Sequence, residues 1–169
     1  MKTQKGFTLI ELIIVIVVLG ILAVTAAPQF FNFSSDARES TVKGLQGAVN
    51  GAKDIIYGKA AIAGLEKNEE ETCGATGDAV CEVEGVELSY GYPVATADGI
   101  MAALNVGSDF SSVVATAAVG AVAIDDLVIF PADKSVTDDI DPDTECYVIY
   151  TQAADESTPP VITAVTSGC

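Results

Sequence analysis

The sequence has no histidine and no tryptophan, and lysine and arginine together account for only eight of its 169 residues. The absence of histidine removes the usual general base for activating a serine or cysteine nucleophile. It also removes a common zinc ligand, and the cysteines show no Cys-x-x-Cys spacing that would compensate. The few basic residues form no cluster, which argues against direct binding of nucleic acid. We therefore expect a protein that is not an enzyme, uses no cofactor and binds no nucleic acid.

Acidic residues are abundant where basic residues are scarce. Asp and Glu together number 24, and the formal net charge is -16 at pH 7. Adjacent carboxylates such as Asp125-Asp126 and Asp138-Asp139 could in principle act as acid and base, but on so acidic a surface such pairs are usually solvated. We interpret the acidity as a source of solubility and mutual repulsion. A polymer of this chain would be strongly anionic.

A long uncharged run lies near the start of the chain. It extends from Gly6 to Ser35 and contains one ionisable side chain, Glu11. Phe7–Ala27 comprises 21 residues. A helix of that length spans about 30 Å, which is the thickness of the hydrocarbon core of a bilayer. The sequence therefore predicts a membrane-spanning helix.

Basic residues flank this run on one side only. Lys2 and Lys5 precede it, and the next positive charge is Arg38. By the positive-inside rule, the short N-terminal tail stays cytoplasmic and everything after the run is exported. The exported part has about 140 residues, which is enough for one globular head.

A conventional secretion signal is the main alternative for this run. Val24-Thr25-Ala26 offers a cleavage site that would release a secreted acidic binding domain beginning at Ala27. The apolar core is long for such a signal, and Glu11 lies inside it. A carboxylate near the edge of a bilayer costs about 2.5 kcal/mol or less unless it is paired. Glu11 therefore either finds a partner on another subunit or snorkels into the interface.

Four cysteines in an exported chain favour two disulfides over free thiols. Four cysteines allow three pairings, and the sequence does not choose among them. We favour Cys73 with Cys81, which closes a short polar loop, and Cys146 with Cys169, which ties the last residue to a strand.

A second helical pattern follows the uncharged run. Its apolar positions recur at steps of three and four. They are Val42, Leu45, Val49, Ala52, Ile56, Ala60 and Ala63. Pro28 removes one backbone donor and is expected to kink or loosen the helix locally. Gly44, Gly47 and Gly51 form either a surface for close approach of another helix or a merely weak stretch, and both readings stay open.

The rest of the chain has the residue composition that is typical of a small β domain. Residues 64–87 are typical of a solvated loop, and Thr96–Val106 is typical of a short helix. Four segments are rich in β-branched and aromatic residues, and the last two should form a hairpin. They are Leu88–Pro93, Val122–Pro131, Cys146–Gln152 and Val161–Thr166. The predicted fold class is α+β, with a long N-terminal helix packed on a small antiparallel sheet.

Alternating carboxylates suggest a weak calcium site. Calcium takes six to eight oxygen ligands, but the positions that an EF-hand loop reserves for glycine and glutamate hold Thr144 and Tyr150 here. A plain acidic loop is therefore favoured over a metal site. The candidate ligands are Asp139, Asp141, Asp143 and Glu145.

Residues 6–12 read Gly-Phe-Thr-Leu-Ile-Glu-Leu, after a short basic leader and before an apolar run that ends at Pro28. This arrangement resembles the N-terminus of the type IV pilin and pseudopilin superfamily. Three further segments are similar, more narrowly, to pilins of the mannose-sensitive haemagglutinin type. They are Ala23–Phe31, Tyr57–Ala61 and Tyr90–Pro93.

The resemblance implies how the chain would be processed and assembled. A prepilin peptidase would cut between Gly6 and Phe7 and methylate the new amino group of Phe7. Removing the leader would bring the net charge to -18, with six basic residues left against 24 acidic ones. Glu11 would then face the positive terminus of Phe7 on an adjacent subunit.

The resemblance also implies four parts in the chain. These are a leader peptide (1–6), a transmembrane and fibre-core helix (7–28), an amphipathic helix half (29–63) and a β-rich head (64–169). The expected product is a homopolymeric type IV pilus for adhesion, surface attachment and biofilm formation. Its subunits would pass from the bacterial inner membrane through a pilus assembly platform to an extracellular filament. A further hypothesis is that the helix melts locally between Pro28 and Ser35 within the filament. The alternative within the superfamily is a pseudopilin of a type II secretion system.

Overall fold

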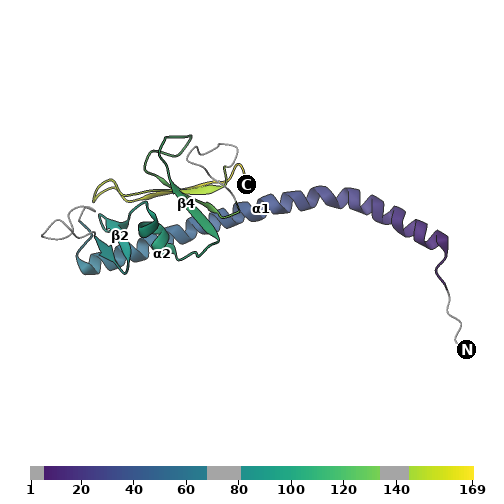
Figure 1. Ribbon diagram of the computed structural model, residues 1–169, viewed down its shortest axis with the longest axis horizontal. Coiled ribbons are helices and arrows are strands. Elements are labelled where there is room, and N and C mark those ends of the chain that lie inside the picture. Colours follow the sequence, from purple (N-terminus) through teal and green to yellow (C-terminus); the bar gives the residue numbers. More distant parts are fainter. Residues whose placement is uncertain (1–5, 68–80, 134–144) are drawn as a thin grey trace, which may run out of the picture. The chain divides into compact units, whose positions relative to one another are not determined.

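The computed structural model describes residues 6–67, 81–133 and 145–169, and for residues 26–32 it describes secondary structure but not side chains. Its contacts divide the chain into two compact units, Met1–Ala37 and Arg38–Cys169. One helix and two antiparallel sheets account for most of the ordered elements (Figure 1). The predicted α+β fold class is confirmed.

Helix α1 extends from Leu9 to Ala63 and is assigned as a single helix through Pro28. The predicted local loosening at Pro28 is therefore absent from the secondary structure of this single chain, while melting within a filament stays a prediction. The helix ends at Gly64, which adopts φ +73°. Leu65 N–H donates to Ala60 C=O at 2.9 Å and Gly64 N–H to Ala61 C=O at 3.2 Å, which is the Schellman pattern that a glycine permits after a helix.

The larger sheet contains four antiparallel strands in the order β4-β5-β6-β7. These are β4 (Phe110–Val114), β5 (Leu127–Pro131), β6 (Tyr147–Thr151) and β7 (Val161–Val165). Strands β6 and β7 pair in register from Tyr147↔Val165 to Thr151↔Val161, so the predicted C-terminal hairpin is confirmed.

The two faces of this sheet bury different side chains, because successive residues of a strand point to opposite faces. Leu127, Ile129, Val148 and Tyr150 form one cluster with the stripe residues Val42, Leu45 and Val49 of α1. Val128, Phe130, Tyr147 and Ile149 form a second cluster with Ala115 and Val122, which lie in the segment between β4 and β5. Helix α1 therefore covers one face of the sheet, and the β4–β5 segment covers the other.

A smaller sheet packs on the last turns of α1. It contains β1 (Glu82–Val83), β2 (Val86–Ser89) and β3 (Tyr92–Pro93). Its core joins Val86 and Leu88 to Ile56 and Ala60 of the helix. The buried Tyr150 O–H donates to Pro93 C=O at 2.6 Å, and this bond links the small sheet to the large one.

Helical structure between the sheets is confirmed at residues 97–104. A π-helical turn, η1 (Ala97–Met101), continues into α2 (Ala102–Leu104). Gly99 has non-helical backbone angles, and a Cβ there would lie 2.2 Å from Val94 C=O. This close approach requires glycine.

Two of the strand predictions need correction, and strand β4 was missed. Leu88–Pro93 is not one strand, because Tyr90 (φ 52°) and Gly91 (φ 78°) form a tight turn between β2 and β3. Val122–Asp126 is loop rather than strand, and β5 begins only at Leu127. Strand β4 was not predicted, since its sequence Phe-Ser-Ser-Val-Val is short and half polar and is stabilised by pairing with β5.

The stripe predicted for the second half of α1 is confirmed in its centre. Val42, Val49 and Ala60 are fully buried, and Leu45 and Ile56 are at most 5% exposed. Ala63 is exposed, because the chain turns away from the helix at Gly64.

Candidate assembly site

The N-terminal end of α1 is built around a reciprocal pair of hydrogen bonds between Thr8 and Glu11. The Thr8 N–H donates to Glu11 Oε2 at 2.9 Å, and the Thr8 hydroxyl donates to the same oxygen at 2.6 Å. The Glu11 N–H lies 3.4 Å from Thr8 Oγ1. Since Leu9 is the first helical residue, Thr8 is the N-cap and Glu11 is the third helical position. This is the capping box, in which each side chain satisfies a backbone donor of the other.

The capping box changes how the Glu11 carboxylate is understood. Sequence reasoning gave it no partner within its own chain, whereas the structure gives it two donors from Thr8. The Thr-x-x-Glu spacing is visible in the sequence and could have predicted this pair. Negative charge in the first turn also interacts favourably with the helix dipole. A contact between Glu11 and Phe7 of an adjacent subunit stays a prediction.

The Gly6–Phe7 peptide bond precedes the helix. Gly6 and Phe7 lie in non-helical backbone, both residues are exposed, and the Phe7 side chain is 86% exposed. Access to this bond is therefore open in the single chain. Cleavage there and methylation of Phe7 stay predictions.

The first half of α1 carries a large apolar surface. Thirteen large apolar side chains between Leu9 and Val24 are each 46–76% exposed. Monomeric proteins rarely expose a contiguous apolar surface of this extent, so it indicates a partner or an apolar environment. The sequence predicts a membrane span over residues 7–28. Within the described ranges, no helix combines the length and hydropathy that crossing a membrane requires, and this prediction is not confirmed.

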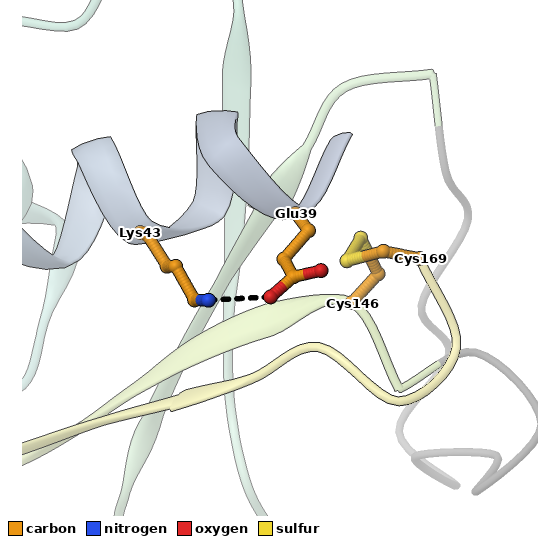
Figure 2. A network of polar contacts seen from close by, with 4 residues as sticks. All are labelled: Glu39, Lys43, Cys146 and Cys169. Carbon is orange, nitrogen blue, oxygen red and sulfur yellow. Dashed lines mark hydrogen bonds and ion pairs between the residues drawn. A yellow bond between two sulfur atoms is a disulfide. The ribbon is translucent and has the colours of Figure 1, made fainter. Parts of the chain in front are cut away.

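The disulfide Cys146–Cys169 links the last residue to the residue that precedes β6. This predicted pairing is confirmed. The Cα atoms of the two residues are 4.8 Å apart. Figure 2 shows the disulfide together with Glu39 of α1, which forms an ion pair with Lys43 one turn along the helix. Cys81 is buried and disulfide-bonded. Cys73 lies outside the described residues, so the pairing Cys73–Cys81 stays a prediction.

The calcium candidate is largely untested, because Asp139, Asp141 and Asp143 lie outside the described residues. The fourth candidate, Glu145, accepts a hydrogen bond from the Ser167 hydroxyl. Within the part of the chain that the structure describes, no three acidic or cysteine side chains gather as a metal site would require.

Comparison with known proteins bears on the N-terminal region. Residues 1–27 match the family described as the prokaryotic N-terminal methylation motif. This match contains the Gly6–Phe7 bond and the Thr8–Glu11 pair. No solved structure matches the chain.

Several curated fimbrial proteins are similar to the chain. The type IV major alpha-pilin of Moraxella bovis is 39% identical over 79 residues, which are 45% of this chain and 50% of that protein. The type IV major fimbrial protein FimA of Dichelobacter nodosus is 36% identical over 110 residues, or 56% of this chain and 66% of that protein. A fimbrial protein of Pseudomonas aeruginosa is 42% identical over 67 residues, or 37% of this chain and 42% of that protein.

The chain spans about half the length of the first curated relatives that it matches. The exposed apolar helix, its capped start and the matched motif all belong to the same N-terminal region. Over that region, the chain carries the prokaryotic N-terminal methylation motif and is similar to type IV pilins and related fimbrial proteins.

Proposed function

We propose that this chain is the structural subunit of a bacterial type IV pilus, which polymerises through its N-terminal helix into a surface filament. The observation that carries the proposal is the largely exposed apolar surface of α1 between Leu9 and Val24, which lies within the matched methylation motif. An apolar helix surface of this extent indicates a partner or an apolar environment, and further copies of the same helix provide a partner that is equally apolar. The similarity to structural fimbrial proteins also favours a non-enzymatic role.

Processing between Gly6 and Phe7 prepares the helix for assembly. Cleavage creates a positive amino terminus four residues before Glu11, and a prepilin peptidase would methylate it. In the precursor, Glu11 accepts two hydrogen bonds from Thr8. In the fibre, the carboxylate gains the charged Phe7 terminus of an adjacent subunit, and such a charge-assisted bond is roughly twice as strong as a neutral one. Assembly thereby adds a counter-charge to the two hydrogen bonds that Thr8 donates.

The proposed route runs from a precursor held at the inner membrane, through an assembly platform, to an extracellular filament. The matched motif and the relatives named as type IV major fimbrial proteins support this route. A pseudopilin of a type II secretion system shares the N-terminus and is the alternative. Adhesion, surface attachment and biofilm formation are the proposed roles of the filament.

The mannose-sensitive haemagglutinin type is the proposed subtype. Two of the segments that carry this resemblance, Tyr57–Ala61 and Tyr90–Pro93, touch in the fold. The rings of Tyr57 and Tyr92 stack with centroids 4.4 Å apart. A Cβ on Gly91 would lie 2.8 Å from Glu66 Cα, so the turn packs closely against the end of α1. These two segments thus form one local unit.

Two measurements on cells that express the chain test the proposed function. Mass spectrometry of sheared surface material should find a subunit that begins with methylated Phe7, whereas one beginning at Ala27 would support the secreted domain. Electron microscopy should show long surface filaments that disappear when the gene is deleted. A secretion defect without loss of filaments would favour the pseudopilin.

A further inference from the structure

Five large apolar side chains are exposed among the described residues of the unit Arg38–Cys169. They are Ile55, Ile62, Val114, Ile124 and Val161. Val161 stands alone at the start of β7. The other four form two pairs, one on α1 and one at the ends of the segment between β4 and β5. A head with so high a net negative charge is expected to repel its own copies, so its uncharged apolar surfaces need an explanation.

The first pair belongs to the loop surface, which we define as Val114–Ile124. No charged residue occurs from Phe110 to Ile124. Val122 is buried against the sheet, whereas Ile124 is 58% exposed and Val114 is 39% exposed. Val119 and Val122 exchange backbone hydrogen bonds of 3.0 Å in both directions. The Asp126 carboxylate accepts from the Ala123 N–H at 2.7 Å. The loop surface is therefore an ordered apolar structure rather than a free chain.

The second pair belongs to the helix surface, which we define as Ile55, Gly58, Lys59 and Ile62. These residues are three or four positions apart and therefore share one side of α1. Ile55 is 61% exposed and Ile62 is 90% exposed, and a Cβ on Gly58 would meet nothing within 4 Å. Lys59 is ion-paired with Glu84 and is 39% exposed at its side chain. This surface is thus apolar with one basic residue at its centre.

The two surfaces are different parts of the head. Val42, Leu45 and Val49 of α1 pack on one face of the large sheet, and Ala115 and Val122 pack on the other. The helix surface lies on later turns of α1, where Ile56 and Ala60 pack on the smaller sheet. Figure 1 shows the β4–β5 segment on the side of the large sheet away from α1. A contact between two different surfaces is heterologous, and it builds an open filament where the rotation between copies does not close a ring.

We propose that the loop surface of one subunit docks on the helix surface of a second copy of this chain. The inference rests on the proposed function, because it assigns a head-to-head contact within the filament. Uncharged surfaces let strongly anionic heads approach, since like charges placed opposite each other are costly. Asp125, directly after Ile124, carries the charge opposite to that of Lys59, the one basic residue of the helix surface, which is already paired with Glu84 of its own subunit.

The first test introduces a charge at matched exposed positions. Ile124→Asp places a carboxylate in the loop surface, and Val161→Asp is the control because Val161 is 57% exposed but outside both surfaces. We expect Ile124→Asp to lower the yield of sheared filaments about tenfold or more, because an unpaired charge is buried against the neighbour. Val161→Asp should leave the yield close to that of the unsubstituted chain.

Several outcomes of this test would overturn the docking proposal. Equal losses in both variants would mean a general charge effect, and equal yields would mean no contact at the loop surface. Normal filaments that no longer attach to a substrate would assign the loop surface to an adhesion target instead. If the unsubstituted chain formed no filaments, both the proposed function and this inference would be refuted.

The second test uses cysteine substitutions, which introduce no charge that could destabilise the fold. Ile124→Cys combined with Ile62→Cys should give, after mild oxidation of filaments, a ladder of covalent multimers on non-reducing gels. Each single variant should give no ladder, because a heterologous contact needs both cysteines. Filaments of the double variant that remain monomeric on the gel would refute the contact while leaving the proposed function intact.

Discussion

The two halves of α1 use apolar residues in opposite ways. Between Leu9 and Val24 the large apolar side chains are 46–76% exposed, while Val42, Leu45, Val49 and Ile56 are at most 5% exposed. The second half completes a core within its own chain, whereas the described large apolar side chains from Leu9 to Val24 are not part of such a core. Burial of apolar surface contributes roughly 25 cal/mol per Å² to stability. The exposed apolar surface of the first half would therefore contribute this free energy only when a partner buries it. One helix thus packs into the core of the head at one end and, under the proposed function, associates with other subunits at the other.

The largest expected effect is on the free energy of unfolding, and it should distinguish the two halves of α1. Leu45→Ala removes a buried side chain and leaves a cavity, so the head should lose about 2–5 kcal/mol of its free energy of unfolding. Leu19→Ala, at a position that is 58% exposed, should leave that free energy unchanged. Denaturant unfolding of the full chain in detergent measures both. A comparable loss from Leu19→Ala would show that the first half also has an intramolecular core.

Removal of the C-terminal disulfide should affect only the second unit. The double change Cys146→Ser and Cys169→Ser opens a loop with a sequence separation of 23 residues. On a chain-entropy model the head should lose about 3 kcal/mol of stability. Hydrogen exchange should then speed up in β6 and β7 and stay unchanged for residues 9–24. Equal acceleration in both regions would contradict their independence.

A smaller effect should come from the buried hydroxyl of Tyr150. Tyr150→Phe leaves Pro93 C=O without its donor and should cost about 1–3 kcal/mol, measured by denaturant unfolding. Phenylalanine keeps the ring, so packing against α1 serves as the internal control. An unchanged free energy would show that this bond does not hold the two sheets together.

The same residue predicts a loss of stability in alkali. Burial raises the pKa of Tyr150 far above its ordinary value, and burial also raises the pKa of Tyr147 and of Tyr92. A raised pKa in the folded state gives stability that is complete below the unfolded value of about 10 and is lost as the pH rises above it. Thermal unfolding from pH 8 to 11 should show this decline, and Tyr150→Phe should make it shallower. An identical decline in both proteins would assign it to other groups.

The smallest effect should appear at the start of the first half. Thr8→Ala removes the cap and should cost about 1 kcal/mol of local helix stability, whereas Thr8→Ser should retain it. Hydrogen exchange of residues 9–12 should rise in the alanine variant alone. The stability of the head should not change. If the serine variant frayed equally, the capping box would not be what orders this turn.

Sequence periodicity predicted α1 and its buried stripe because helical spacing is a local property of the chain. The same locality allowed the C-terminal hairpin and the pairing Cys146–Cys169 to be predicted. It could also have predicted the Thr8–Glu11 capping box, whose spacing was present but not used. Strand β4 could not be predicted, because its five residues become a strand only by pairing with β5. The turn at Tyr90-Gly91 was missed because its neighbours are themselves typical of strands.

By itself the sequence determined the apolar N-terminal run, the methylation motif and the amphipathic stripe, since each depends on the order of neighbouring residues. The tertiary structure alone decided which face of the large sheet meets α1 and which face the β4–β5 segment covers. It also decided that Ile55, Ile62 and Ile124 remain exposed. These outcomes depend on contacts between residues far apart in the chain, and local spacing carries no information about such contacts.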